Sequence, residues 1–129
     1  MASLQLEVRV SNSPELGAHG VVQAIRSAEA GDRETAMRGY RDALAARFMH
    51  AQSWANLAAL GIALGDPQAA RQHAMRALQL DPRHSDAWVN LGVASWHAGQ
   101  HREGAQAMNQ ALQHVPGLAA AALNYALML

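Results

Sequence analysis

The 129-residue sequence contains neither cysteine nor lysine. Without cysteine, neither a disulfide framework nor a thiolate metal site can form. Without lysine, all ten basic residues are arginine, and ten Asp and Glu residues balance them to a formal net charge of zero. A chain without a basic excess has no field that attracts nucleic acid or an acidic membrane surface. We therefore expect no nucleic-acid partner.

Long apolar segments are also missing. No uncharged run has the length and pattern of a bilayer span, and the first residues, MASLQLEVRVSNSP, lack the basic and apolar regions of a signal peptide. We expect no membrane insertion and a cytoplasmic location, or a periplasmic one if a signal peptide has been removed. With 50% hydrophobic and 16% charged residues, the chain has the composition of one folded domain.

The main feature that is present is a repeat of 34 residues, with blocks at 17–50, 51–84 and 85–118 and a partial fourth at 119–129. Trp54, Leu57, Ala58, Ala70, Ala77 and Pro82 of the second block correspond to Trp88, Leu91, Gly92, Gly104, Ala111 and Pro116 of the third. The first block departs from this pattern, because it lacks the first Trp and has Phe48 in place of Pro. A period of this length is typical of stacked helix pairs.

Glycine followed by a capping residue marks the turn inside each pair, at Gly31-Asp32, Gly65-Asp66-Pro67 and Gly99-Gln100. We predict an all-α domain over residues 14–129, preceded by an arm at 1–13. The predicted helices span about 14–30, 33–47, 51–64, 67–80, 85–98 and 101–114, with a last one from about 119. Ser13-Pro14 is the predicted start of the first helix.

The segment Trp88-Val89-Asn90-Leu91-Gly92, with the later Ala and Pro positions, resembles the tetratricopeptide repeat over residues 17–129. This resemblance implies an α-solenoid in which the first helix of each pair lines a concave groove that binds a protein or peptide. Carried over by repeat position, the binding residues would be Asn56, Asn90, Asn124, Val89, Val93, Trp96, Ile62 and Gln52. The family's carboxylate clamp for chaperone tails requires Lys, Asn and Arg. Here Val21, Ile25, Asp86 and Asn90 stand at those places, so we do not expect that partner.

Asn56, Asn90 and Asn124 recur every 34 residues and should form a column along the groove. With helices about 9–10 Å apart and an extended peptide rising roughly 3.3 Å per residue, each Asn would meet every third backbone amide. Such a column would hold a main chain without reading its sequence. It looks like the asparagine column of the tetratricopeptide region in O-linked N-acetylglucosamine transferases. The alternative is that each Asn bonds within its own helix pair.

Three aromatic residues have different expected roles. Trp54 and Trp88 stand at the structural position of the repeat and should be core residues. Trp96 falls on the groove side, where a Trp can be a binding hot spot. Its alternative is packing against the last helix near Leu123 or Leu127.

Catalytic and metal sites are not predicted, and no cofactor is expected. His97 and His101 have the i, i+4 spacing of two metal ligands, with Glu103 nearby, but Gly99 ends the helix between them. No nucleophile with a base, phosphate-binding loop or carboxylate pair is recognisable.

The two ends of the sequence are unusual. Leu4, Leu6, Val8 and Val10 alternate with polar residues, which is the pattern of a half-buried strand. This arm could be disordered, pair with a copy of itself, or lie along a groove by strand addition. From Gly104 to Leu129 there is no Asp, Glu, Lys or Arg. Either the native chain continues, or another subunit covers the apolar surface formed by Leu123, Leu127, Met128 and Leu129.

These patterns support three hypotheses. The first is an interaction scaffold that binds a peptide or partner protein in the groove. The second is self-association into a homo-oligomer through the apolar C-terminal helix. The third is the non-catalytic docking region of a larger bacterial enzyme, such as a glycosyltransferase.

Overall fold

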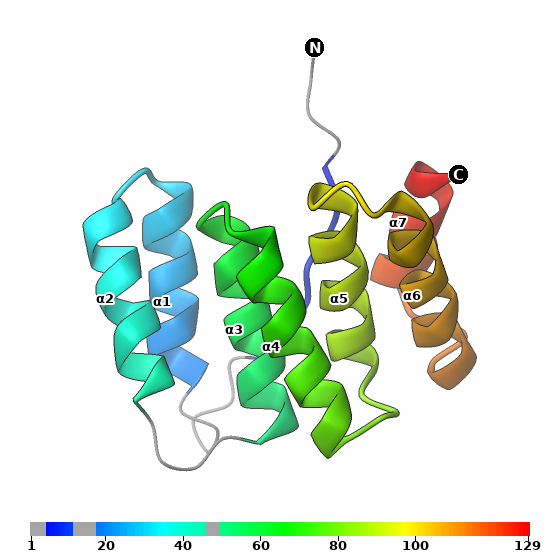
Figure 1. Cartoon of the computed structure of the whole chain (residues 1–129), viewed down its shortest axis with the longest axis horizontal. Helices are drawn as coiled ribbons and strands as arrows, with labels where there is room; N and C mark the ends of the chain where they lie inside the picture. The colour runs from blue at the N-terminus through cyan, green and yellow to red at the C-terminus, as the bar shows by residue number, and fades with distance from the viewer. Residues whose placement is uncertain (1–4, 12–17, 46–49) are drawn as a thin grey trace.

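A computed structural model describes residues 5–11, 18–45 and 50–129, and its regular elements are all helices (Figure 1). They are α1 (Ala18–Glu29), α2 (Arg33–Leu44), α3 (Ala51–Ala63), α4 (Pro67–Leu80), α5 (Ser85–His97), α6 (His101–His114) and α7 (Ala119–Met128). The all-α solenoid prediction is confirmed. Each helix with described ends lies within three residues of its predicted bounds. The predicted start at Ser13-Pro14 lies outside the described residues.

The turns inside the helix pairs form as the glycines predict. Gly31, Gly65 and Gly99 have φ of 87°, 78° and 86°, a left-handed conformation that residues with a side chain rarely adopt. The next helix then starts at a cap: the Asp32 and Asp66 carboxylates accept hydrogen bonds from the amides of Thr35 and Ala69. These tight turns make the two helices of each pair antiparallel (Figure 1).

Small residues set the distance between paired helices. A Cβ atom at Gly92 would lie 2.8 Å from the backbone oxygen of Gly104, and one at Gly104 would lie 2.9 Å from the backbone oxygen of Gly92. The two glycines therefore allow α5 and α6 to approach closely, and Met108 and Ala107 fill the space beside them. Buried alanines take the equivalent places in the other pairs, as at Ala24, Ala58 and Ala70.

The prediction that Trp54 and Trp88 are core residues is wrong in part, because both are only partly buried. The indole N–H of Trp88 donates to the carbonyl of Pro82 at 2.8 Å, which draws this edge of the ring toward a surface turn. The ring of Trp54 stacks on that of His73 at a centroid distance of 5.6 Å. Polar N–H groups need a partner, and a surface turn supplies one without burying an unsatisfied donor.

A polar contact joins α2 to α4. The Tyr40 hydroxyl and His73 Nε2 lie 2.6 Å apart in a hydrogen bond beside Trp54. Burial lowers the pKa of the His73 imidazole, and the Asp66 carboxylate opposes this shift. Burial also raises the pKa of the Tyr40 hydroxyl. The folded state therefore favours neutral forms of both rings.

This contact predicts a pH dependence of stability. Because the folded state lowers the pKa of His73, the unfolded chain binds more protons once the pH falls below about 6.5. The free energy of unfolding should be highest above that pH and should fall as the pH drops through the lower pKa of the folded state. Urea titrations between pH 7.5 and 5 measure it. His73→Phe should flatten the dependence of the free energy of unfolding on pH. Tyr40→Phe, which keeps the titrating imidazole, should retain a slope; equal slopes in the parent and His73→Phe would contradict this origin.

Candidate functional site: an asparagine column that holds the N-terminal arm

The groove of the solenoid contains a segment of the chain itself. Residues Gln5–Ser11, hereafter the arm, run extended along the inner helices α3, α5 and α7 (blue in Figure 1). The sequence left open whether this segment is disordered, pairs with a copy, or lies along a groove; for these residues the structure has the last arrangement.

The three repeated asparagines hold the backbone of the arm. Each amide accepts a hydrogen bond from the N–H of one arm residue and donates one to the carbonyl of the same residue. Asn124 binds Glu7 at 2.8 and 2.8 Å, Asn90 binds Arg9 at 2.7 and 2.8 Å, and Asn56 binds Ser11 at 3.0 and 2.9 Å. All three side chains have 0% exposure. The column therefore presents to the arm the same groups, in the same order, as a neighbouring β-strand would.

The predicted spacing of every third residue is wrong, because the column binds every second residue, at positions 7, 9 and 11. In an extended chain, the N–H and C=O of one residue point to the same edge, and those of the next residue point to the opposite edge. A period of three would present alternating edges to the column. The distance between helix axes therefore does not set the period of bound residues. The pleat of the extended chain sets it, because only alternate residues turn their N–H and C=O groups to the column.

Further hydrogen bonds fix the orientation of the amides. Asn90 Nδ2 also donates to the carbonyl of Ala55 at 2.8 Å, on the preceding inner helix. Asn56 Oδ1 accepts a second hydrogen bond from Gln52 Nε2 at 3.0 Å. Asn124 Nδ2 lies 3.8 Å from the Met108 sulfur. These contacts hold the donor and acceptor of each amide in the order that the arm requires.

The apolar side chains of the arm pack on the core of the solenoid. Leu6 contacts the buried cluster that contains Val89 and Val93, and Val10 contacts the cluster around Val21 and Ile25. Val8 lies between the two and contacts both. The strand-like alternation in the sequence thus places one set of side chains against the groove floor.

One arm side chain is bound through its charge. Arg9 Nε donates to Asp86 Oδ1 at 2.9 Å, and the two side chains are 41% and 17% exposed. Asp86 lies in the first turn of α5, one turn before Asn90. A single helix therefore supplies both the amide that holds the backbone of Arg9 and the carboxylate that meets its guanidinium.

Comparisons with known proteins support the repeat fold. The family model of the tetratricopeptide repeat matches residues 61–123, from the end of α3 through α4, α5 and α6 to the first half of α7. The matched residues are therefore tetratricopeptide repeats. A search of curated proteins gave no match.

Solved tetratricopeptide repeat domains have the same fold. The second domain of human RPAP3, solved in complex with the HSP70 peptide SGPTIEEVD, has a TM-score of 0.69 at 23% identity, covering 90% of this chain and 98% of that one. The first domain of human RPAP3 has a TM-score of 0.72 at 16% identity, covering 90% and 91%. The Arabidopsis OM64 domain has a TM-score of 0.70 at 20% identity, covering 88% and 94%.

The other groove residues expected from the repeat positions take several roles. Val89 and Val93 are fully buried beneath the arm, and Ile62 packs on two core clusters. Trp96 packs against the core cluster that contains Val93 and Met128, and its ring stacks on that of His101, the first residue of α6, at a centroid distance of 4.1 Å. Beside the arm a hollow of about 260 Å³ remains, lined in part by Ile62, Glu29 and His97.

The apolar surface predicted on α7 needs one correction. Leu123, Leu127 and Leu129 are 45%, 41% and 83% exposed, but Met128 is only 8% exposed and belongs to the core cluster around Val93. Met128 follows Asn124 by four residues and so shares the inward face of α7. Self-association through the three leucines stays a prediction.

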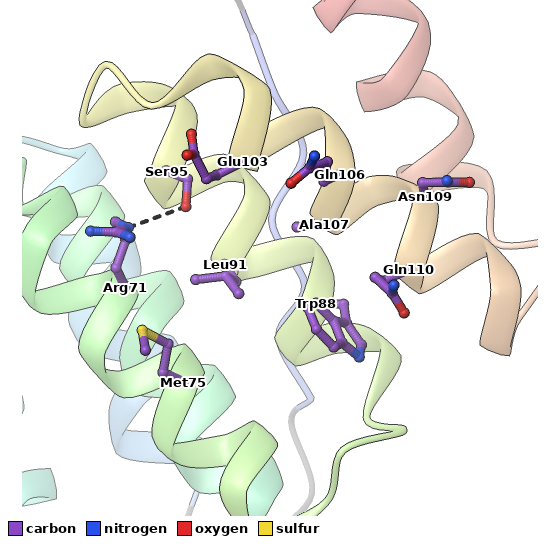
Figure 2. Close-up of a pocket in the computed structure, with 10 residues that line it drawn as sticks. All are labelled: Arg71, Met75, Trp88, Leu91, Ser95, Glu103, Gln106, Ala107, Asn109 and Gln110. Carbon is purple, nitrogen blue, oxygen red and sulfur yellow. Dashed lines mark hydrogen bonds between the residues drawn. The ribbon is translucent and has the colours of Figure 1, made fainter.

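A second depression lies between α4, α5 and α6. Figure 2 views this depression, with the arm passing behind α5. It measures about 550 Å³ and is lined by Met75, Leu91 and the partly buried Trp88, with the Arg71–Ser95 hydrogen bond of 3.2 Å at one side. No titratable cluster or unsatisfied buried group of this depression points to a ligand among the described residues.

Metal and membrane sites are not found in the described part of the chain. No group of three or more His, Cys, Asp or Glu side chains there could hold a metal ion. None of the helices described above has the length and apolarity needed to cross a bilayer.

The sequence did not indicate the Arg9–Asp86 pair, and it left the occupant of the groove open among three arrangements of the arm. A signal was available. An alternating segment in an otherwise helical chain has no sheet to join, while three Asn residues at equal intervals offer unpaired amide groups. Their distance in sequence, up to 117 residues, hid the connection.

Proposed function

We propose that this tetratricopeptide domain is a protein-interaction module whose groove holds an extended segment of a partner protein by its backbone. The double hydrogen bonding of alternate residues by Asn56, Asn90 and Asn124 carries the proposal. The amides contact main-chain atoms, which every polypeptide has, and the apolar floor binds alternate side chains. This is recognition by strand addition in which the side chains of helices replace the neighbouring strand.

The arm then acts as an internal competitor. It makes the contacts that a partner segment would make, and its attachment to the domain gives it an effective concentration on the order of millimolar. A partner in solution must displace it. Weak binding of a free peptide to the unaltered chain is therefore expected.

The partner differs from the peptide seen with the human RPAP3 domain. That peptide, SGPTIEEVD, is acidic near its C-terminus. The groove described here has no lysine to receive a terminal carboxylate, and Asp86 places a negative charge beside the bound backbone. Repulsion between like charges disfavours an acidic tail.

Binding can be measured on the full chain after its own arm has been released. Val8→Asp places a charge against both core clusters that Val8 contacts, which costs several kcal/mol if it stays buried. A fluorescent peptide with the sequence of residues 4–12 should bind this variant at least tenfold more tightly than the unaltered chain, by fluorescence anisotropy. Equal affinities for the two chains would contradict the proposal.

N-methylated peptides provide a matched control. A methyl group on the nitrogen that corresponds to Arg9 removes the donor to Asn90 and leaves a buried acceptor unsatisfied, which costs about 1–3 kcal/mol, or roughly tenfold or more in affinity. A methyl group on the nitrogen that corresponds to Val8 lies on the opposite edge and should change affinity less than threefold. Equal losses would show that the Asn column does not hold the backbone.

A further inference from the structure

The asparagine column holds any extended backbone, but the groove also contains a charged contact that depends on sequence. We propose, on the basis of the function proposed above, that Asp86 makes the groove selective for extended segments with Arg between two aliphatic residues. The preferred partner has the pattern of Leu6–Val10: aliphatic residues at alternate positions, with a guanidinium group opposite Asp86.

The position of Asp86 supports this assignment. Its side chain is 17% exposed, so solvent screens it less than a surface carboxylate. Among the described residues, no hydrogen bond or ion pair other than that to Arg9 is found for its carboxylate. Without an Arg in the groove, this mostly buried charge would lose the ion pair and hydrogen bond that Arg9 provides.

The Asn column makes the charge selective by fixing the register. Asn90 binds the N–H and C=O of Arg9, and Asp86, one helical turn earlier, binds the side chain of the same residue. A segment shifted by one residue would turn its aliphatic side chains away from the floor. One shifted by two would place another residue opposite Asp86. The groove therefore selects a segment by its register and by the charge opposite Asp86 at the same time.

The aliphatic positions restrict the partner further. Val8 contacts both core clusters, while Leu6 and Val10 each contact one. Branched aliphatic side chains suit an extended backbone on an apolar floor. By contrast, Gln5 and Glu7 are exposed, and we expect these positions to accept most residues.

The bound segment also has a direction. Its N-terminal side lies at Asn124 of α7 and its C-terminal side at Asn56 of α3, opposite to the order of the repeats. A peptide with the reversed sequence would move the guanidinium and the aliphatic residues out of this arrangement. It should bind at least tenfold more weakly.

A charge-swap experiment tests the proposal on the full-length Val8→Asp chain. Against this host, the peptide of residues 4–12 with Glu in place of Arg9 should bind about five- to tenfold more weakly than the parent peptide, as expected for a partly buried ion pair with a hydrogen bond. Adding Asp86→Arg to the host should reverse the order of the two peptides. The matched control is a peptide with Arg in place of Glu7, which should change affinity less than twofold.

The outcomes separate the two proposals. If the parent peptide does not bind the Val8→Asp chain, both the proposed function and this selectivity fail. If it binds but both hosts prefer the same peptide, only the selectivity is overturned. Asp86→Asn provides a second host should Asp86→Arg lose its helical circular dichroism. It should bind both peptides within twofold, and a persisting preference for Arg would overturn the role of Asp86.

Discussion

Replacing Asn90 with alanine should release the centre of the arm and lower the free energy of unfolding by about 2–4 kcal/mol. Asn90 is fully buried and makes three hydrogen bonds, two to Arg9 and one to the carbonyl of Ala55. Removing its amide leaves these buried groups without their side-chain partner, and each such group costs about 1–3 kcal/mol if water does not replace it. Chemical denaturation gives the change in stability.

Hydrogen exchange distinguishes a loss of protection confined to the arm from a general loss of stability. In the parent chain the amides of Glu7, Arg9 and Ser11 should exchange slowly, because the column accepts their protons. Those of the intervening residues should exchange quickly. In Asn90→Ala the Arg9 amide should exchange at least tenfold faster. Asn109→Ala, on the exposed face of α6, is the matched control and should change neither quantity. Equal protection at consecutive arm residues would contradict the pairing.

Replacing Gly104 with alanine should lower the free energy of unfolding by about 2–3 kcal/mol, even though alanine favours a helix by up to ~1 kcal/mol over glycine. Its Cβ atom would lie 2.9 Å from the backbone oxygen of Gly92 and 3.4 Å from the Trp96 Cβ. A backbone atom cannot rotate away, so α5 and α6 must separate. Thermal unfolding should show a Tm lower by roughly 10 °C.

Gly20 offers the matched control for this substitution. It lies in α1, and a Cβ atom there meets no atom within 4 Å. Gly20→Ala should therefore leave stability unchanged or raise it by up to ~1 kcal/mol. If both variants gain stability, the close approach of the two helices does not depend on Gly104.

Moving α5 away from α6 should also affect the groove. Asp86 and Asn90 lie on α5, and Asn124 of the column lies on α7, which packs against α6. The three asparagines match the pleat of the arm only while these helices keep their spacing. Stability and arm binding are therefore coupled through the packing of glycine against backbone.

The sequence by itself determined the helices, the turns and the order of the repeats. These features follow from local chemistry: glycine at a left-handed turn, Asp at the cap, and small residues at fixed intervals. The interval of 34 residues also placed Asn56, Asn90 and Asn124 at equivalent positions of the solenoid. The turns and caps depend on neighbouring residues, and the equivalence of the asparagines depends on a simple period, so the sequence alone predicts them.

Only the tertiary structure decided what the asparagines bind. The alternating arm had no local partner, and its hydrogen bonds join residues 45 to 117 positions apart. The period of two arises because an extended chain turns alternate peptide groups to one edge, which becomes relevant only when a backbone lies against the column. Likewise, Met128 looks as apolar as Leu129 in sequence, but the docking of α7 buries the first at 8% exposure and leaves the second at 83%.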